Sequence, residues 1–459
     1  MLRRLPLAIV ASAFFLVATT GLYAQESKSA PSADVVAAKA NDFLQAHVDV
    51  NGFSGSVLIG KGDQVLFARG YGLANAEFNI TNTPQTKFRL GSITKQFTAM
   101  AIMLLAEKGK LSLEDPISKY IENSPEPWKD VTIHHLLSHT GGVPSFTSLP
   151  TYGASMPLPT TPSKTIDRVR TMKLEFKPGE KFNYSNTGYV MLGAIIEKVS
   201  GQSYEKYLEE NVFMPLGMKN TGYDSPTKIL ANRASGFEIA GDKLSHASYL
   251  DMTIPYAAGA LYSTVEDMHQ WSMALDDGKL ISPASATKMY TPVKNNYAYG
   301  WAIGKRFGRQ TIGHGGGING FQTDITRFPS EKLCVVVLCN NNRSQPGQVA
   351  NGLAAIALGE KYDLPKKRKF ITVAPKILDL YVGDYQVAPG LVLSITRDGE
   401  HLFGQATGQG KAELHAESET AFFVREANGV ITFAKDATGK ITHLTLKQGG
   451  RDTKANRVK

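Results

Sequence analysis

A serine and a lysine three residues apart, Ser92 and Lys95, stand at the start of a long apolar segment. On a helix, residues at this spacing share one face with Cβ atoms about 5–6 Å apart, which lets the amine approach the hydroxyl. Apolar surroundings and the positive end of the helix dipole both disfavour a charged amine, so we expect the pKa of Lys95 to fall. The pair is therefore a candidate nucleophile and base, and the Ser92 backbone N–H is a candidate oxyanion donor.

The spacing by itself is not specific, because S-x-x-K occurs four times, at Ser92, Ser203, Ser225 and Ser285. Ser92 differs in its context. It follows Gly91, which permits a sharp entry into a buried helix, whereas the other three serines lie in more polar surroundings. We therefore expect Ser92 to be the nucleophile.

The only Y-x-N sequence of the chain, Tyr184-Ser185-Asn186, is a second candidate. A tyrosine with its ordinary pKa near 10 is a poor base. Beside a lysine cation Tyr184 would titrate lower and could relay the serine proton. The alternative is a core tyrosine followed by Asn186 as the N-cap of the next helix. The residues alone leave both interpretations open.

A third candidate is the run His314-Gly315-Gly316-Gly317, which we expect at the end of a strand and inside a turn. Glycines there let the backbone approach a ligand and can turn an N–H toward an oxyanion. The alternative is an ordinary hairpin turn. His139 begins a second H-x-G sequence, but it is expected to end a helix and shape a loop.

Signals for cofactors and nucleic acids are weak. His135 and His139 have H-x-x-x-H spacing without the Glu of a zinc protease helix, and there is no Walker loop, so we expect no metal and no organic cofactor. The formal net charge is +9, and its densest run, residues 366–369, suits a linker better than a phosphate-binding patch. No nucleic-acid-binding signature accompanies it. Nucleic acid is therefore not expected as a partner.

The elements that would position these residues follow from periodicity and turn signals. A hairpin turns at Gly62-Asp63. Helices are expected over residues 35–48, from 92 onward, and over 133–137, 189–199, 204–210 and 265–275. Strands are expected over residues 299–304, 310–313, 321–328 and 333–338. Strands at both ends with helices between them predict an α+β fold, in which the two terminal portions close one antiparallel sheet.

The composition and the apolar pattern of the sequence change near residue 360. A basic, Pro-containing stretch at 363–375 is typical of a linker. In residues 376–459, short alternating runs flank Asp398-Gly399 and Asn428-Gly429, which are strong hairpin signals. We expect a small all-β barrel or curled sheet there. The predicted organisation is a signal peptide at 1–24, a catalytic domain at 25–362, the linker, and this β domain.

The first 24 residues have the pattern of an export signal: Arg3 and Arg4, an apolar run over residues 7–17, and a tolerable cleavage site before Gln25. An uncleaved anchor is the alternative. No Cys lies near the cleavage site, so a lipoprotein is not expected, and the protein is predicted to be periplasmic or secreted. The only cysteines, Cys334 and Cys339, would lie about 16 Å apart on one strand, too far for a disulfide.

The three motifs stand in a fixed order: S-x-x-K, then Y-x-N, then H-G-G. In this order the chain resembles the penicillin-recognising serine hydrolases, which include class C β-lactamases, D-alanyl-D-alanine carboxypeptidases, D-aminopeptidases and related esterases. TIHHLLSHTGGV, KPGEKFNYSNTGY and AAGALYSTVEDMHQW support the resemblance, which covers roughly residues 36–360. The C-terminal unit is similar to the lipocalin-like β domains appended to some members.

The resemblance implies a β-lactamase/transpeptidase-like fold and a role for each residue. Ser92 would be the nucleophile, Lys95 its partner base and Tyr184 a second proton relay. Asn186 would hold Lys95 and a substrate amide. His314 would stand in place of the Lys of K-T-G, with Gly315 and Gly316 in the same motif. Gly317 would donate the second oxyanion N–H.

The histidine departs from the β-lactamase pattern. A His with a pKa near 6.5 is mostly neutral at pH 7, so a carboxylate would gain from its protonation only at lower pH. The resemblance therefore implies an exported serine hydrolase that forms an acyl-enzyme on D-amino-acid peptides or amides, small esters or, weakly, β-lactams. Cell-wall peptidoglycan fragments are a further candidate partner. The alternatives are a penicillin-binding sensor without turnover, or a binder of small apolar ligands through the C-terminal barrel. The oligomeric state is left open.

Overall fold

The structure is a computed structural model that describes residues 31–240, 243–365, 368–388, 390–407, 411–424, 429–448 and 451–458. The predicted export signal at residues 1–24 lies outside the described residues. Among those described, no helix combines the length and apolar character needed to cross a membrane.

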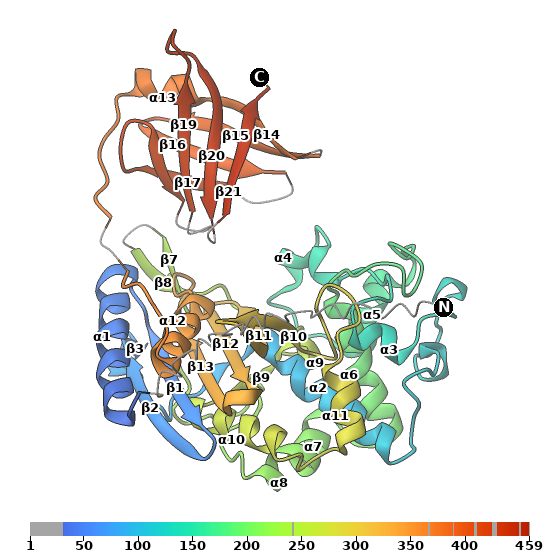
Figure 1. Ribbon diagram of the computed structural model, residues 1–459. Coiled ribbons are helices and arrows are strands. Elements are labelled where there is room, and N and C mark those ends of the chain that lie inside the picture. Colours follow the sequence, from blue (N-terminus) through green and yellow to red (C-terminus); the bar gives the residue numbers. More distant parts are fainter. Residues whose placement is uncertain are drawn as a thin grey trace, which may run out of the picture.

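A six-stranded antiparallel sheet forms the centre of the larger unit, in the order β10-β11-β12-β13-β1-β2 (Figure 1). The N-terminal hairpin pairs with the last strand, with Val57 opposite Val337. This arrangement confirms the predicted sheet, closed by its two terminal portions. Its strands are β1 (Gly55–Lys61), β2 (Gln64–Tyr71), β10 (Ala302–Arg306), β11 (Arg309–Ile318), β12 (Phe321–Phe328) and β13 (Leu333–Cys339).

Helices cover both faces of the sheet. Helices α1 (Ala33–Asn51) and α12 (Pro346–Leu358) pack on one face, in a cluster that contains Val335, Val337 and Cys339 of β13 (Figure 1). The alternate residues of β13, including Cys334, face the second and larger cluster. Because side chains alternate along a strand, β13 must be apolar throughout to bury both faces. The two thiols are free and buried in different clusters, as the strand spacing predicted.

Helix α2 (Thr94–Glu107) lies inside the larger cluster and is buried from Thr94 to Leu105. It follows a single 3₁₀ turn at Gly91–Ile93. Helix α6 (Asn186–Ser200) and the short helix α9 (Tyr256–Gly259) pack against it. An apolar sequence nearly all round explains this position, since such a helix is stable only when surrounded.

Shorter elements complete the larger unit. The short strands are β3 (Leu73–Asn75), β4 (Ile80–Thr81), β5 (Phe88–Arg89), β6 (Gly222–Tyr223), β7 (Phe237–Ala240), β8 (Lys243–His246) and β9 (Leu261–Ser263). The other helices are α3 (Ile133–Leu137), α4 (Tyr152–Ser155), α5 (Pro162–Arg170), α7 (Tyr204–Leu208), α8 (Met214–Leu216), α10 (Val265–Asp276) and α11 (Pro283–Tyr290). Single helical turns lie at Ile117–Lys119, Glu126–Trp128, Phe146–Ser148 and Pro329–Glu331, and a π-helical turn at Glu209–Phe213.

The position of the glycine run differs from the prediction. His314 to Gly317 lie within β11, which continues to Ile318, and the turn falls instead at Asn319-Gly320, where Gly320 has φ +75°. The glycines serve close packing, because a Cβ atom on Gly316 would collide with the carbonyl oxygen of Leu90. Strand pairing therefore tolerates these glycines where the sequence pattern suggested a turn.

The C-terminal unit is a closed barrel of eight antiparallel strands, which together with the α+β unit confirms the predicted fold class (Figure 1). Side chains fill its interior, and the rings of Tyr381 and Phe433 stack 4.3 Å apart. A filled interior does not favour a ligand-binding barrel. Its elements are α13 (Pro375–Tyr381), β14 (Gly383–Ala388), β15 (Leu391–Asp398), β16 (His401–Ala406), β17 (Ala412–Ala416), β18 (Ala421–Val424), β19 (Gly429–Lys435), β20 (Ile441–Gln448) and β21 (Arg451–Arg457).

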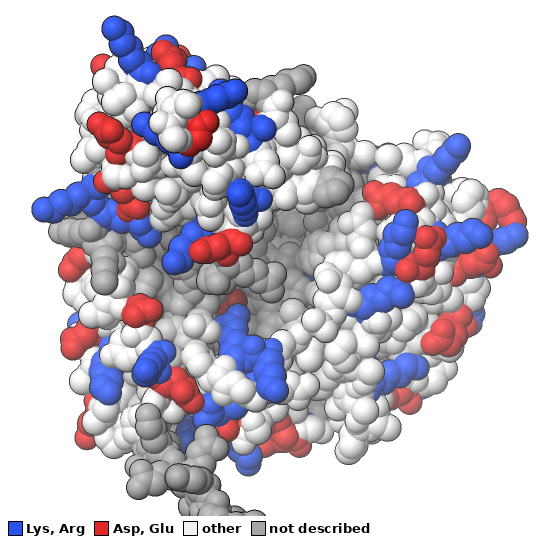
Figure 2. Space-filling model, turned by 45° about the horizontal axis from the view of Figure 1, so that its top comes forward, with Lys and Arg blue, Asp and Glu red and all other residues white. Residues whose placement is uncertain are grey.

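The charged side chains are distributed over the surface. On the face in Figure 2, Lys and Arg are interspersed with Asp and Glu rather than gathered in one broad basic area. The described residues on this face therefore form no continuous basic stripe of the kind typical of a nucleic-acid interface.

Candidate active site

Ser92 lies where strand β5 leads into helix α2. Residues Phe88 and Arg89 pair with β9, Gly91 turns the chain with φ +55°, and the helical turn begins at once. Only glycine adopts this left-handed conformation without strain, so the predicted role of Gly91 is confirmed. Ser92 is partly exposed on a cleft of about 160 Å³ that Asn186, Ala258 and Gly317 also line.

Lys95 is fully buried beside Ser92. Its Nζ lies 3.2 Å from Ser92 Oγ, 2.8 Å from Asn186 Oδ1 and 2.8 Å from the Ala258 carbonyl oxygen. Burial lowers the pKa of Lys95 well below its ordinary value, as the apolar helix predicted. No carboxylate pairs with it among the described residues. A neutral amine can donate its two hydrogens to the Asn186 and Ala258 oxygens, and its lone pair can accept the hydrogen of the Ser92 hydroxyl.

Tyr184 covers the other side of Lys95, with the lysine Nζ 4.8 Å from the centre of its ring. Its hydroxyl is buried and makes no hydrogen bond to a described residue. Burial raises the pKa of Tyr184, and the nearby Ser92 hydroxyl opposes this only in part. The expectation that a lysine cation lowers the pKa of Tyr184 is wrong, because Lys95 is itself desolvated and loses its charge first.

Asn186 is the first residue of α6, and Ser185 is its N-cap, accepting a hydrogen bond from the Gly188 N–H. The alternative of Asn186 as an N-cap is therefore wrong. Its side chain is free to bridge, accepting from Lys95 and donating from Nδ2 to Thr147 Oγ1 at 3.1 Å. The cap residue thus fixes the helix start while its neighbour reaches the lysine.

Gly317 brings the end of β11 against the segment before Ser92. A Cβ atom on Gly91 would lie 2.9 Å from the Gly317 nitrogen, so the two backbones approach closely because residue 91 has no side chain. Thr323 Oγ1 donates to the Leu90 carbonyl at 2.8 Å and ties β12 to the same segment. The backbone of Gly317 therefore borders the cleft beside Ser92, where a second oxyanion donor is needed.

His314 is held by hydrogen bonds through both ring nitrogens. Its Nδ1 lies 2.6 Å from the Gly315 carbonyl oxygen and its Nε2 lies 2.9 Å from the Tyr297 hydroxyl. Since a carbonyl only accepts, Nδ1 carries the proton and Nε2 accepts from Tyr297. Burial and the nearby Lys95 lower the pKa of His314 to about 4.

This geometry corrects the expected behaviour of His314. A histidine with a pKa near 6.5 would acquire charge in mildly acidic solution, but His314 stays neutral there. Its ring nitrogens already have partners, so a substrate carboxylate would have to displace one of them. The residue is better suited to holding the strand and Tyr297 than to binding an anion.

Two further residues, which the sequence analysis did not select, pack against Tyr184 and His314. His139 is buried with φ +57°, its Nδ1 accepts from the Ser185 N–H, and its ring lies 4.2 Å from that of Tyr184. Tyr297 lies 4.8 Å from the His139 ring as well as bonding His314. The second H-x-G sequence was a signal for His139, although we expected only a loop there. Tyr297 stands in no motif.

The three other S-x-x-K serines have structural positions. Ser203 is the N-cap of α7, and its Oγ accepts from the Lys206 N–H. Ser285 lies in the first turn of α11, where its N–H donates to the N-cap Ser282. Ser225 Oγ bonds Thr227 in an exposed loop. None of these serines lines the cleft around Ser92. Among the described residues, no three His, Cys, Asp or Glu side chains are grouped as a metal site requires.

The chain is similar in sequence to known proteins over most of its length. A family model described as Beta-lactamase matches residues 40–359, and one described as a domain of unknown function (DUF3471) matches residues 367–457. Penicillin-binding protein 4* of Bacillus subtilis (strain 168) is 30% identical over 430 residues, 87% of this chain and 94% of that protein.

Two solved structures are similar in fold. The octameric penicillin-binding protein homologue from Pyrococcus abyssi has a TM-score of 0.66 and 29% identity, covering 91% of this chain and 99% of that one. A D-stereospecific amidohydrolase from Streptomyces sp. has a TM-score of 0.61 and 25% identity, covering 71% of this chain and 99% of that one. The first family match includes every residue of the cleft around Ser92.

Proposed function

Because this chain belongs to the beta-lactamase family, we propose that it is a serine hydrolase whose acyl-enzyme forms on Ser92. The observation that carries the proposal is the setting of Lys95. A buried amine with a lowered pKa, held by two oxygen acceptors and facing a serine hydroxyl, is a base ready to take the serine proton.

In the acylation step, Ser92 Oγ attacks the substrate carbonyl carbon while its proton moves to Lys95 Nζ. The oxyanion forms between the backbone N–H groups of Ser92 and Gly317, two residues that line the cleft. The bond from the carbonyl carbon to the leaving nitrogen or oxygen then breaks. Tyr184, which is protonated and has no hydrogen-bond partner among the described residues, gives its proton to the leaving group and recovers one from Lys95.

Deacylation reverses these roles with water in place of the leaving group. A water molecule gives its proton to the basic relay while its oxygen attacks the ester carbon. The ester bond breaks, Ser92 Oγ regains a proton, and the acid product leaves. The same neutral amine therefore serves both half-reactions, and no metal ion is required by this scheme.

For the substrate we propose D-amino-acid amides or peptides, with small esters as a second class. The structural neighbour from Streptomyces sp. supports amides, because that protein is a D-stereospecific amidohydrolase and 99% of its chain is covered. His314 is neutral and both of its ring nitrogens are hydrogen-bonded, so it supplies no fixed cation for the carboxylate of a β-lactam. We therefore expect slow acylation by β-lactams and little turnover. Peptidoglycan fragments remain a candidate natural substrate.

We also propose export to the periplasm or the medium, on the basis of the Arg3-Arg4 and apolar pattern of the first 24 residues. Fractionation of expressing cells, with N-terminal sequencing of the product, tests it. A mature protein that begins near Gln25 is the expected result, and an intact Met1 in the cytoplasmic fraction would contradict export.

The test of the main proposal is a substrate panel with mass detection of the acyl-enzyme. D- and L-amino-acid amides, D-Ala-D-Ala peptides, chromogenic esters and β-lactams are compared on the parent and on Ser92→Ala. We expect turnover of D-amides above L-amides, with an acyl adduct on the peptide that contains Ser92. Stoichiometric acylation without turnover on the whole panel would instead favour a penicillin-binding sensor.

A further inference from the structure

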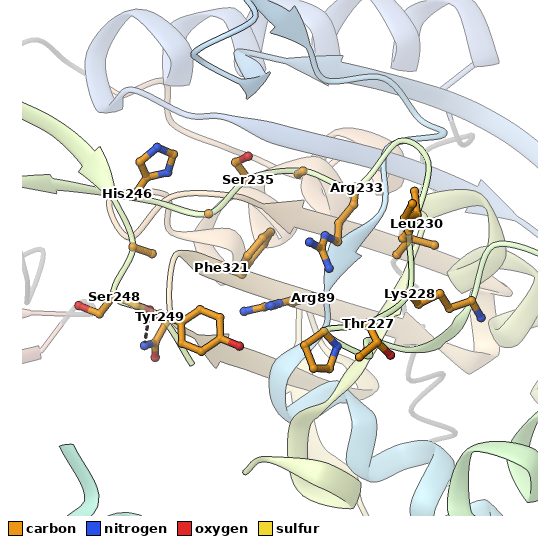
Figure 3. A pocket seen from close by; sticks show the side chains of 16 residues that line it. Arg89, Thr227, Lys228, Leu230, Arg233, Ser235, His246, Ser248, Tyr249 and Phe321 are labelled. Carbon is orange, nitrogen blue, oxygen red and sulfur yellow. Dashed lines mark hydrogen bonds between the residues drawn. The ribbon is translucent and has the colours of Figure 1, made fainter. Parts of the chain in front are cut away.

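A second and larger pocket, of about 650 Å³, adjoins the cleft that contains Ser92. The two share Asn319 in the turn after β11. Arg89 of β5 and Phe321 at the start of β12 form part of its wall, and Arg233, Lys228 and Tyr249 come from the segments before β7 and after β8 (Figure 3). We call this space, with these six residues, the acyl-side pocket.

The lining of the acyl-side pocket is cationic. Among the described residues that line it are Arg89, Lys228 and Arg233, but no Asp or Glu. Asp224, which is buried beneath it, accepts from Arg89 Nε at 2.6 Å and from Arg233 Nη1 at 2.8 Å. One carboxylate thus binds two guanidinium groups, whereas Glu77 and Glu238 bond to other lining residues, His246 and the Ser248 N–H.

The free edges of these guanidinium groups face the pocket. In Figure 3, Arg89 and Arg233 point toward the same space beside Phe321. Among the described residues, neither guanidinium has a second acceptor, and the Arg233 side chain is 38% exposed. An arginine edge with unused N–H groups is the geometry that binds a carboxylate through two parallel hydrogen bonds.

Aromatic side chains lie beside the guanidinium groups in the acyl-side pocket. The Phe321 ring lies 5.9 Å from the Arg89 guanidinium carbon, and Tyr249, which is 58% exposed, also lines the pocket (Figure 3). Such walls contact a hydrocarbon chain while the arginines take its charged end. The pocket therefore fits an apolar chain that ends in an anion better than a free inorganic ion.

The position of the proton relay decides which part of a substrate reaches this pocket. The leaving group must depart toward Tyr184, and the Tyr184 ring lies beside His314, 6.3 Å away. His314 precedes Gly317 on β11 and Asn319 follows it. The acyl group therefore extends the other way, past Gly317 to Asn319, which is about 7 Å farther along at roughly 3.3 Å per residue.

We propose that the acyl-side pocket binds a carboxylate at the far end of the acyl group, so that the enzyme prefers acyl donors with an acidic terminus. The inference rests on the proposed acyl-enzyme mechanism and specifies its substrate class. Arg233 is the residue to change, because both arginines bind Asp224 but the Arg89 side chain is more enclosed, 17% exposed against 38%.

The experiment uses paired chromogenic esters on the full chain. p-Nitrophenyl monoesters of succinic, glutaric, adipic and suberic acid are each compared with the uncharged alkanoate of equal chain length, at pH 7. In the parent, kcat/KM should favour the acidic ester at the best length. Arg233→Gln should lower that acidic-to-neutral ratio about 10-fold or more, mainly through KM, as the loss of a charge-assisted hydrogen bond predicts.

Lys243→Gln is the matched control, since it removes an exposed cation of the neighbouring strand β8 that does not line the pocket. It should leave the ratio as in the parent. A ratio near one at every chain length, or an equal effect of both variants, would overturn the proposal. If Arg233→Gln does not fold, Lys228→Gln takes its place, and the parent series alone still decides whether an acidic terminus is preferred.

The experiment gives different results when the carboxylate-binding pocket is contradicted and when the acyl-enzyme mechanism on Ser92 is contradicted. If neutral esters are hydrolysed and Ser92→Ala abolishes this, the mechanism stands whatever the acidic ratio is. If no ester is hydrolysed, calorimetry on Ser92→Ala compares adipic acid monoanilide with hexananilide, which needs no turnover. Tighter binding of the acidic anilide, lost in the double variant with Arg233→Gln, supports the pocket, and equal binding contradicts it.

Discussion

Gly91 and Gly317 approach so closely that a Cβ atom on Gly91 would lie 2.9 Å from the Gly317 nitrogen and 3.1 Å from its carbonyl carbon. The contact joins the segment that carries Ser92 to the strand that carries the second candidate oxyanion donor. The close approach therefore depends on the absence of a side chain at Gly91, since a Cβ atom on Gly317 would meet only the Gln322 side chain.

Gly91→Ala should consequently push β11 away from Ser92 and widen the oxyanion site. We expect kcat/KM on an ester to fall about 10²–10³-fold, the usual effect of losing one oxyanion donor. Gly109→Ala is the matched control, because Gly109 also has positive φ (+63°) but nothing within 4 Å of its Cβ position. A similar loss of activity in both variants would mean that backbone strain, not oxyanion geometry, is responsible.

Ser92→Ala should abolish turnover and covalent labelling by a fluorophosphonate or a penicillin probe. Ser225→Ala is the control, since Ser225 has the same S-x-x-K spacing but lies in an exposed loop. This variant should keep both turnover and labelling. Intact-protein mass spectrometry measures the labelling. An adduct that persists in Ser92→Ala would rule out this serine as the nucleophile.

The state of Lys95 should govern the acid side of the pH profile. Its pKa is lowered, so the amine is neutral above that pKa and becomes protonated, and useless as a base, as pH falls through it. Hence kcat/KM should rise with pH and then level off. Lys95→Arg, which stays protonated throughout, should lose about 10²–10⁴-fold of the activity at every pH, as expected for removal of a general base. An unchanged profile in this variant would exclude Lys95 as the base.

His314 should contribute no inflection near pH 6.5. With a pKa of about 4 it is neutral at every pH above roughly 5, so acidic and neutral esters should give parallel profiles between pH 5 and 8. The unfolded chain, with an ordinary histidine pKa, binds the proton first. Stability linked to His314 is therefore complete above about pH 6.5 and lost as pH falls toward 4. An acidic-ester profile displaced to lower pH would show a cationic His314.

His139 should matter for stability because of its conformation and its acceptor. His139→Leu places a larger residue at φ +57° and removes the acceptor of the buried Ser185 N–H, which together should cost about 2–4 kcal/mol in urea unfolding. His139→Asn tolerates positive φ better and should cost less. Equal losses for the two variants would show that ring packing against Tyr184, rather than the backbone, sets the cost.

Much of this architecture could be predicted from local signals. Period-two apolar runs with Gly62-Asp63 and Asp398-Gly399 turns gave the hairpins, and the buried run of β13 gave a strand covered on both faces. The S-x-x-K spacing placed Ser92 and Lys95 on one helix face, with Gly91 as the turn before them. These features depend on residues close in sequence, so the sequence contains the information that decides them.

Other features depend on contacts between distant segments. The sequence determined that His314 to Gly317 lie close together, but only the pairing of β11 with β12 decided that they continue a strand and that Gly317 faces Gly91. The titration of Lys95, Tyr184 and His314 follows from desolvation and from neighbours such as Ala258 and Tyr297, none of which is adjacent in the chain. A pKa reports the whole surroundings of a group, so motif spacing determines which residues can react and tertiary packing decides their charge.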